Sequence, residues 1–247
     1  MKITPIKTDI VWPFTQDITD ILANALTSIP ENSILAITSK VISLCEGNVI
    51  ATEAADKDEL IQQEADLFLP KGNNQYNVYL TIKNNILIPN AGIDESNASG
   101  YYVLWPKDPQ ASAERCWRFI KESYQVRNFG IIITDSTVTP LRWGVTGTCL
   151  SHCGFSSINN HVGRRDLFGR IMSMTKVNVV DAFASAAVLC MGETDEQTPI
   201  ALIEDVSFTH FQDDPPTGQQ LDEARIDPGD DLFGQLLICV PWRSHKK

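Results

Sequence analysis

Three carboxylates and one hydroxyl stand where buried elements of the chain are expected to end. Asp94 lies in a loop behind a strand and a proline. Asp135 and Ser136 directly follow the apolar run 129–133, and Glu193 follows a helix that ends on a glycine. Because a rigid element fixes the group at its end, these oxygen donors are predicted to converge into a site for Mg²⁺ or Mn²⁺. Taken singly, each acidic segment is also typical of a turn or a helix cap.

Four arginines lie in two glycine-rich stretches of an otherwise acidic chain. Arg142 begins the segment RWGVTG, and the segment GRRDLFGR carries Arg164, Arg165 and Arg170. Guanidinium groups bind carboxylates and phosphates through paired hydrogen bonds. The four arginines are therefore predicted to hold substrate carboxylates or phosphates. Structural salt bridges to nearby acids are the alternative for at least one of them.

A second candidate metal site consists of Cys149, His152 and Cys153, which would share one face of a helix. Thiolate and imidazole ligands suit a softer metal such as zinc. The sequence shows neither an evident fourth ligand nor a CxxC pair. Simple packing of these three side chains is therefore the alternative.

Apolar periodicity predicts the elements that would position these groups. Helices are expected at residues 14–29, 57–68, from 108–109 onward and at 179–191. Strands are expected at residues 33–38, 78–83, 86–88, 129–134, 200–203 and 232–240, and a polar loop at 213–220. The elements mix without a regular alternation, which favours an α+β fold with mixed sheets and flanking helices. We expect a single domain over residues 1–247, of one or two lobes.

The composition argues against some classes of binding partner. The chain has 247 residues and a formal charge of -11, and an acidic surface repels nucleic acid. It has no apolar run long enough to cross a membrane and no apolar leader, which predicts a cytoplasmic protein. A bound cation can neutralise a nucleoside triphosphate even on an acidic protein. Neither GxxxxGK[ST] nor GxGxxG occurs, so such a site would need another construction.

The candidate segments, taken in order, resemble the coenzyme F-420-0:L-glutamate ligase family. The segments are NAGIDESN, IIITDS, RWGVTG, GRRDLFGR and LCMGE, and the resemblance extends over roughly residues 8–204. It implies an α+β fold and a homodimer with intertwined sheets. It also implies a ligase that uses GTP, or ATP, with Mg²⁺ or Mn²⁺ to join L-glutamate to a carboxylate acceptor. Residues 205–247 have no counterpart in that pattern and form a divergent C-terminal segment.

The resemblance also implies roles for individual residues. It implies metal ligation by Asp94, Asp135, Ser136 and Glu193. It implies nucleotide contacts for Trp12, Pro13, Phe14, Thr15, Ser39, Lys40 and Asn97. Phosphoryl transfer would turn the acceptor carboxylate into an acyl phosphate, which the glutamate amine then attacks. The acceptor would be F-420-0 or a reduced folate.

A few positions depart from the family pattern. Leu44 stands where a lysine is common, Val138-Thr139 replaces Gly-Arg, and Ala182 beside Asp181 replaces a helix acid. These departures leave the metal positions intact. One interpretation is a ligase with a different acceptor or nucleotide. The other is a catalytically decayed homologue that still binds a nucleotide or a metal.

Overall fold

The largest sheet of the molecule is built around two apolar strands. In the computed structural model, which describes residues 1–72 and 75–245, β2 (Ser33–Thr38) and β8 (Phe129–Val138) pair in parallel. The strand order is β1-β12-β2-β8-β9, and the other three pairs are antiparallel. The remaining strands are β1 (Lys2–Ile6), β9 (Val145–Cys153) and β12 (Ile200–Glu204). Continuous apolar runs such as those of β2 and β8 indicate strands that are covered on both faces.

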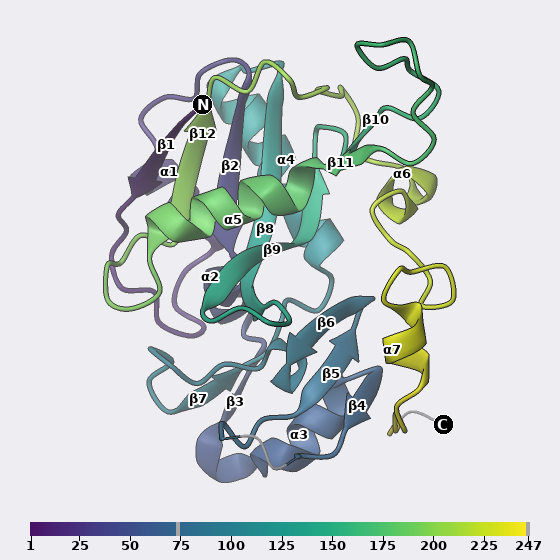
Figure 1. The fold of residues 1–247 in the computed structure, drawn as a ribbon. Helices are drawn as coiled ribbons and strands as arrows, with labels where there is room; N and C mark the ends of the chain where they lie inside the picture. Colours follow the sequence, from purple (N-terminus) through teal and green to yellow (C-terminus); the bar gives the residue numbers. More distant parts are fainter. Residues whose placement is uncertain (73–74, 246–247) are drawn as a thin grey trace.

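Helices cover both faces of this sheet, and Figure 1 shows α5 crossing in front of the strands. The helices are α1 (Ile18–Ala25), α2 (Ser39–Glu46), α4 (Pro109–Tyr124) and α5 (Val179–Met191). Successive side chains of a strand point to opposite faces. Leu35 and Ile131 therefore pack with α1, α2 and α4, whereas Ile34 and Ile132 pack with α5. These three layers form the large lobe.

The small lobe has two further sheets and its own apolar core. Its strands are β3 (Val49–Ala51), β4 (Leu67–Leu69), β5 (Leu80–Lys83), β6 (Ile86–Pro89) and β7 (Tyr101–Val103). β3 pairs with β7, and β4, β5 and β6 form a separate antiparallel sheet. Its helical segments are α3 (Lys57–Glu64) and the 3₁₀ turns Thr52–Ala54 and Asn90–Gly92. Leu60, Ile61 and Phe68 belong to its core.

An arm projects from the large lobe. β10 (Ile158–Asn160) and β11 (Lys176–Asn178) pair at its base, and the loop between them extends away from the sheet (Figure 1). Leu167, Phe168 and Met174 in this loop are almost fully exposed. Large apolar side chains gathered on a projecting loop are typical of a surface that another protein covers.

The divergent segment after residue 205 runs from the large lobe to the small one (Figure 1). Phe208 stacks on Phe183 of α5, with ring centroids 5.6 Å apart. Two short helices follow, α6 (Gly218–Asp222) and α7 (Gly234–Ile238). The segment then reaches β4, where Arg243 and Phe68 exchange two backbone hydrogen bonds of 2.9 Å. The end of the chain is therefore tied to the small lobe.

The mixed α+β architecture confirms the predicted class, and most predicted elements are present. The strands at 33–38 and 200–203, the hairpin around Asn84-Asn85 and the helices at 109 and 179–191 are confirmed. The predicted loop 213–220 is irregular up to Thr217, whose side chain caps α6. No helix among residues 1–72 and 75–245 is long and apolar enough to cross a membrane.

Three predicted boundaries or types were wrong. The helix predicted at 14–29 begins only after Asp17, whose side chain caps it by accepting the Thr19 N–H. The helix predicted at 57–68 ends at Glu64. The residues that follow adopt an extended conformation and form β4, which pairs with β5. The strand predicted at 232–240 is instead the helix α7. A short apolar run fits a strand or a helix equally well, and here no neighbouring strand pairs with it within the described residues.

Candidate active site

A cavity of about 670 Å³ lies between the two lobes. The large lobe contributes residues 8–13, the start of α2, the end of β8 and the loop 192–199. The small lobe contributes side chains between residues 88 and 99. This volume lies within the range of small-molecule sites, and a position between two lobes is a common place for one.

The end of β8 places two oxygen donors on opposite sides of the strand. Because side chains alternate, Asp135 and Ser136 point to different faces. The Ser136 hydroxyl donates to Glu193 Oε1 at 2.7 Å, just beyond the end of α5. Asp135 Oδ2 accepts the indole N–H of Trp105 at 2.5 Å, toward the small lobe. The β8–β9 register shifts between Ile133 and Thr134, and bulges of this kind often lie next to functional sites.

The pKa of Asp135 is raised to about 6. Burial is the main cause, and the negative charge of Asp94 adds to it. Hydrogen bonds from Trp105 and from the Ser136 backbone N–H stabilise the charged form but do not offset the burial. Burial and the neighbouring carboxylate thus raise the pKa by more than the hydrogen bonds and the charge of Lys40 lower it.

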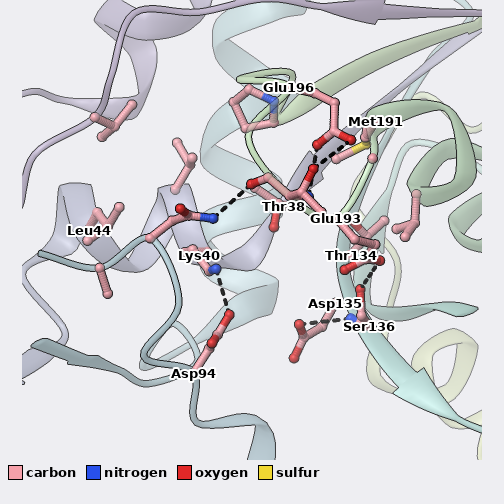
Figure 2. A pocket seen from close by; sticks show the side chains of 18 of the residues that line it. Thr38, Lys40, Leu44, Asp94, Thr134, Asp135, Ser136, Met191, Glu193 and Glu196 are labelled. Atoms are coloured by element: carbon pink, nitrogen blue, oxygen red, sulfur yellow. Dashed lines mark hydrogen bonds and ion pairs between the residues drawn. The ribbon is translucent and has the colours of Figure 1, made fainter. Parts of the chain in front are cut away.

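Asp94 has a cationic partner in this structure. Lys40 Nζ lies 2.6 Å from Asp94 Oδ2, and it also donates to the Ser96 carbonyl at 3.0 Å. Burial acts to raise the pKa of Asp94, but Lys40 and the Ser96 hydrogen bonds outweigh it, so the pKa is lowered. Figure 2 shows Lys40 extending toward Asp94, while Asp135, Ser136 and Glu193 gather on the other side of the cavity. The ammonium group thus covers one oxygen of the Asp94 carboxylate.

The loop that carries Asp94 follows an unusual backbone path. Asn90, Ala91, Gly92 and Asn97 all have positive φ angles, between 51° and 71°. Asparagine and glycine tolerate this left-handed region best, which explains the composition of the segment. The Asn97 side chain donates to the Thr194 carbonyl at 2.8 Å and so joins this loop to the loop 192–199.

The predicted metal and nucleotide residues divide into those that line the cavity and those that support it. Lining residues are Asp94, Asp135, Ser136, Glu193, Trp12, Pro13, Lys40 and Asn97. Phe14, Thr15 and Ser39 are absent from the lining. Phe14 packs against Gly47, and its N–H donates to the Leu44 carbonyl at 3.1 Å. Phe14 therefore holds the Trp12-Pro13 turn against the end of α2.

The four predicted arginines do not line the cavity in this chain. Arg142 lies in the loop between β8 and β9, and the other three lie on the arm. All four are exposed, and Arg142 and Arg165 donate to backbone carbonyls in their own loops. Their predicted contact with phosphate or substrate stays a prediction.

The proposed soft-metal site of Cys149, His152 and Cys153 was wrong. These residues lie on β9, not on a helix. Cys149 packs against the α5 side of the sheet, whereas Cys153 belongs to the core on the α4 side, so the two thiols point to opposite faces. Burial lowers the pKa of His152 to about 4 and raises that of Cys153 to about 12, as expected for core side chains.

The three acids do not form a closed ligand set in this conformation. In the part of the chain that the structure describes, no three His, Cys, Asp or Glu side chains group closely enough to hold a metal ion. Lys40 is paired with Asp94, and Ser136 with Glu193. All four predicted ligands line the same cavity. Binding of a cation by all of them would require these two pairs to separate.

Two contributors to the site escaped the sequence reasoning. Trp105 reaches Asp135 from the small lobe, although only its place before a proline distinguishes it in the sequence. Glu196 lines the cavity and accepts the Thr194 N–H at 2.8 Å. Of the departures from the family pattern, Leu44 and Val138 line the cavity. Ala182 does not line it, and the retained Asp181 beside it accepts the Cys149 N–H at 2.7 Å and so anchors α5 to β9.

Comparison with known proteins places the chain in a family. The family model described as F420-0:Gamma-glutamyl ligase matches residues 5–205. A coenzyme F420:L-glutamate ligase of Methanopyrus kandleri is 33% identical over 204 residues, which are 75% of this chain and 79% of that protein. The protein of the same name from Methanothermobacter thermautotrophicus is 32% identical, over 74% of this chain and 79% of its own length. The chain therefore belongs to the F420-0:gamma-glutamyl ligase family, a family of enzymes that form amide bonds.

Proposed function

We propose that this protein joins L-glutamate to F-420-0, with GTP and a divalent cation, Mg²⁺ or Mn²⁺, as co-substrate and cofactor. The observation that carries the proposal is the cavity between the lobes, which gathers Asp94, Asp135, Ser136 and Glu193 around one space with Lys40. A reduced folate is the alternative acceptor, and ATP the alternative nucleotide. Both acceptors present a carboxylate, which is the group that the reaction needs.

The donor chemistry of the cavity suits a divalent cation, for which the acids would have to move closer together. The donors are all oxygen atoms, which Mg²⁺ and Mn²⁺ prefer. The raised pKa of Asp135, caused by burial and by Asp94, is the electrostatic state that a cation would relieve. Asp94, Asp135, Glu193 and the Ser136 hydroxyl would hold the ion. When bound, the ion would neutralise the triphosphate charge as it develops on the transferred phosphoryl group.

The remaining residues of the cavity would bind and orient the substrates. Lys40, once released from Asp94, would extend its ammonium group to the triphosphate. The exposed ring of Trp12 offers a flat apolar surface to a nucleobase. The acceptor carboxylate would take the phosphoryl group, and the glutamate amine would displace phosphate from the resulting acyl phosphate to form the amide.

We further propose a homodimer in which the arm is buried. The exposed Leu167, Phe168 and Met174 support this, since a free monomer gains nothing from displaying them. Burial of the arm against a second copy would also bring its arginines near another protein surface. Sedimentation velocity of the purified protein tests this directly, and a monomer at micromolar concentration would contradict it.

A glutamylation assay tests the proposed function. Purified protein would receive L-glutamate, GTP and Mn²⁺ with F-420-0 or tetrahydrofolate in parallel, and mass spectrometry would detect addition of one or more glutamyl groups. Asp135→Asn is expected to lower turnover at least about 100-fold, because a buried anionic ligand is lost. Asp213→Asn, at an exposed position outside the cavity, is the control and should retain full activity. Nucleotide binding without turnover of either acceptor would instead favour the decayed homologue.

A further inference from the structure

Trp105 connects the small lobe to Asp135. It follows β7 in the chain and is only 3% exposed. Its indole N–H donates to Asp135 Oδ2 at 2.5 Å, while Asp135 Oδ1 accepts the Ser136 N–H at 2.8 Å. Each oxygen of the carboxylate therefore has one donor from the protein. These two contacts fix the plane of the carboxylate and leave its other lone pairs directed elsewhere.

The indole is itself held from several sides. A Cβ added at Gly92 would lie 2.1 Å from Trp105 Nε1, so the backbone at Gly92 approaches the ring closely. The Lys83 ammonium lies over the ring, 5.1 Å from the ring centroid, and Lys83 is 8% exposed. The Asn48 side chain donates to the Trp105 carbonyl at 2.6 Å. The Gly92 backbone and the Lys83 ammonium thus contact the ring itself, and the Asn48 bond holds the backbone that carries it.

Lys83, which lies over the ring, is itself paired within the small lobe. Lys83, at the end of β5, forms an ion pair of 2.7 Å with Glu64 at the end of α3. A row of contacts thus runs from Glu64 through Lys83 and Trp105 to Asp135. Because a cation over an aromatic face draws on the ring electrons, it also makes the indole N–H a stronger donor. The small lobe therefore contributes one of the two hydrogen bonds that orient this large-lobe carboxylate.

We propose that Trp105 is a positioning residue for the reaction, which holds the Asp135 carboxylate in the orientation that receives the divalent cation. This inference rests on the proposed function, since it concerns a ligand of the proposed metal site. Donors that orient a metal-ligating group typically change metal affinity about 10- to 100-fold when they are removed. Trp105 does not line the cavity, so its effect on a bound cation would pass through Asp135.

The chain offers a matched control for this role. Trp117 is also 3% exposed, and its indole N–H donates to the Phe129 carbonyl at 2.9 Å, in the core on the α4 side. Trp105→Phe and Trp117→Phe therefore make the same chemical change at equal burial. Mn²⁺ affinity would be measured by titration calorimetry in the presence of GTP. We expect Trp105→Phe to weaken it about 10- to 100-fold and Trp117→Phe to leave it within about twofold.

A spectroscopic measurement on the metal-free protein does not depend on how well Trp105→Phe folds. The indole N–H of Trp105, assigned by triple-resonance NMR, is expected far downfield and slow to exchange, as a short bond to a carboxylate requires. Asp135→Ala should move this signal upfield and leave that of Trp117 in place.

These experiments distinguish failure of the proposed metal site from failure of the positioning role of Trp105. If the wild-type protein takes up no Mn²⁺ with GTP, the proposed metal site fails and the role of Trp105 fails with it. If the wild type binds Mn²⁺ and Trp105→Phe binds it equally well, only the positioning role is overturned. An indole signal of Trp105 that is unaffected by Asp135→Ala would overturn it as well.

Discussion

Gly92→Ala is expected to destabilise the protein well beyond the ordinary cost of a glycine substitution. Gly92 has a φ of +71°, and its Cβ position lies 2.1 Å from Trp105 Nε1 and 2.4 Å from Cε2. Alanine in the left-handed region costs about 1–2 kcal/mol. The indole cannot yield without leaving Asp135, and a hydrogen bond to a charged group contributes about 1.5–3 kcal/mol. The expected total is therefore about 2.5–5 kcal/mol.

Gly100 supplies the control for this prediction. It has a φ of +89°, but a Cβ there would meet nothing within 4 Å. Gly100→Ala should therefore cost only the backbone contribution of about 1–2 kcal/mol. Urea denaturation followed by far-UV circular dichroism gives both free energies of unfolding. In a Trp105→Leu background the extra cost at Gly92 should largely disappear, because the clashing ring is gone.

The unfolding free energies of Gly92→Ala and Gly100→Ala can contradict this prediction. Equal losses of unfolding free energy for the two alanine variants would mean that the indole moves aside freely. An undiminished cost of Gly92→Ala in the Trp105→Leu background would place the strain elsewhere in the loop. Either result would also weaken the assignment of Trp105 as a rigid support for Asp135.

Two further predictions concern charged groups. Backbone N–H bonds to Glu31 lower its pKa below 4.5, so its stabilising effect exists above that pH and is lost as the pH falls through the lowered value. The difference in melting temperature between wild type and Glu31→Gln should thus be largest near neutral pH and shrink as the pH falls below 4.5, and a difference that does not change with pH would contradict the assignment. Lys40→Met should weaken GTP binding at least about tenfold by calorimetry, through loss of a charged hydrogen-bond donor. Lys57→Met, which breaks a similar ion pair with Glu95 outside the cavity, should leave GTP binding unchanged, and equal losses in both variants would exclude a specific role for Lys40.

The fold was predictable where burial is continuous. The run Phe129–Ile133 is covered on both faces, as its continuous apolar sequence predicts for a central strand, and α5 is apolar because it crosses the sheet. Helix ends were harder to predict, because Asp17 caps α1 through one hydrogen bond that apolar periodicity does not reveal. The apolar residues of α7 carried no usable signal, because Leu236 is 71% exposed and so does not report a buried face.

The acidic residues of the site were predictable from the sequence, but their hydrogen-bond and ion-pair partners were not. Asp94, Asp135 and Glu193 each follow a rigid element, and the fold brings all three to one cavity. The partners of these acids are distant in sequence: Lys40 lies 54 positions before Asp94, and Trp105 lies 30 positions before Asp135. Such contacts depend on how the two lobes dock, which no local pattern encodes. The single-helix placement of Cys149 and His152 failed for the same reason, because β9 exists only through its pairing with β8.

The return of the chain end to β4 makes one contact of the small lobe depend on an exposed stretch of the C-terminal segment. Arg243 holds Phe68 through two backbone bonds, and about thirty residues separate it from Gln212, which donates to the Gly154 carbonyl on the large lobe. A covalent connection of this length keeps the two partners at a high effective concentration, so the pair re-forms quickly after it breaks. Cleavage in the exposed stretch before α7 would convert that intramolecular contact into a bimolecular one. The chain end would then detach from β4 more readily.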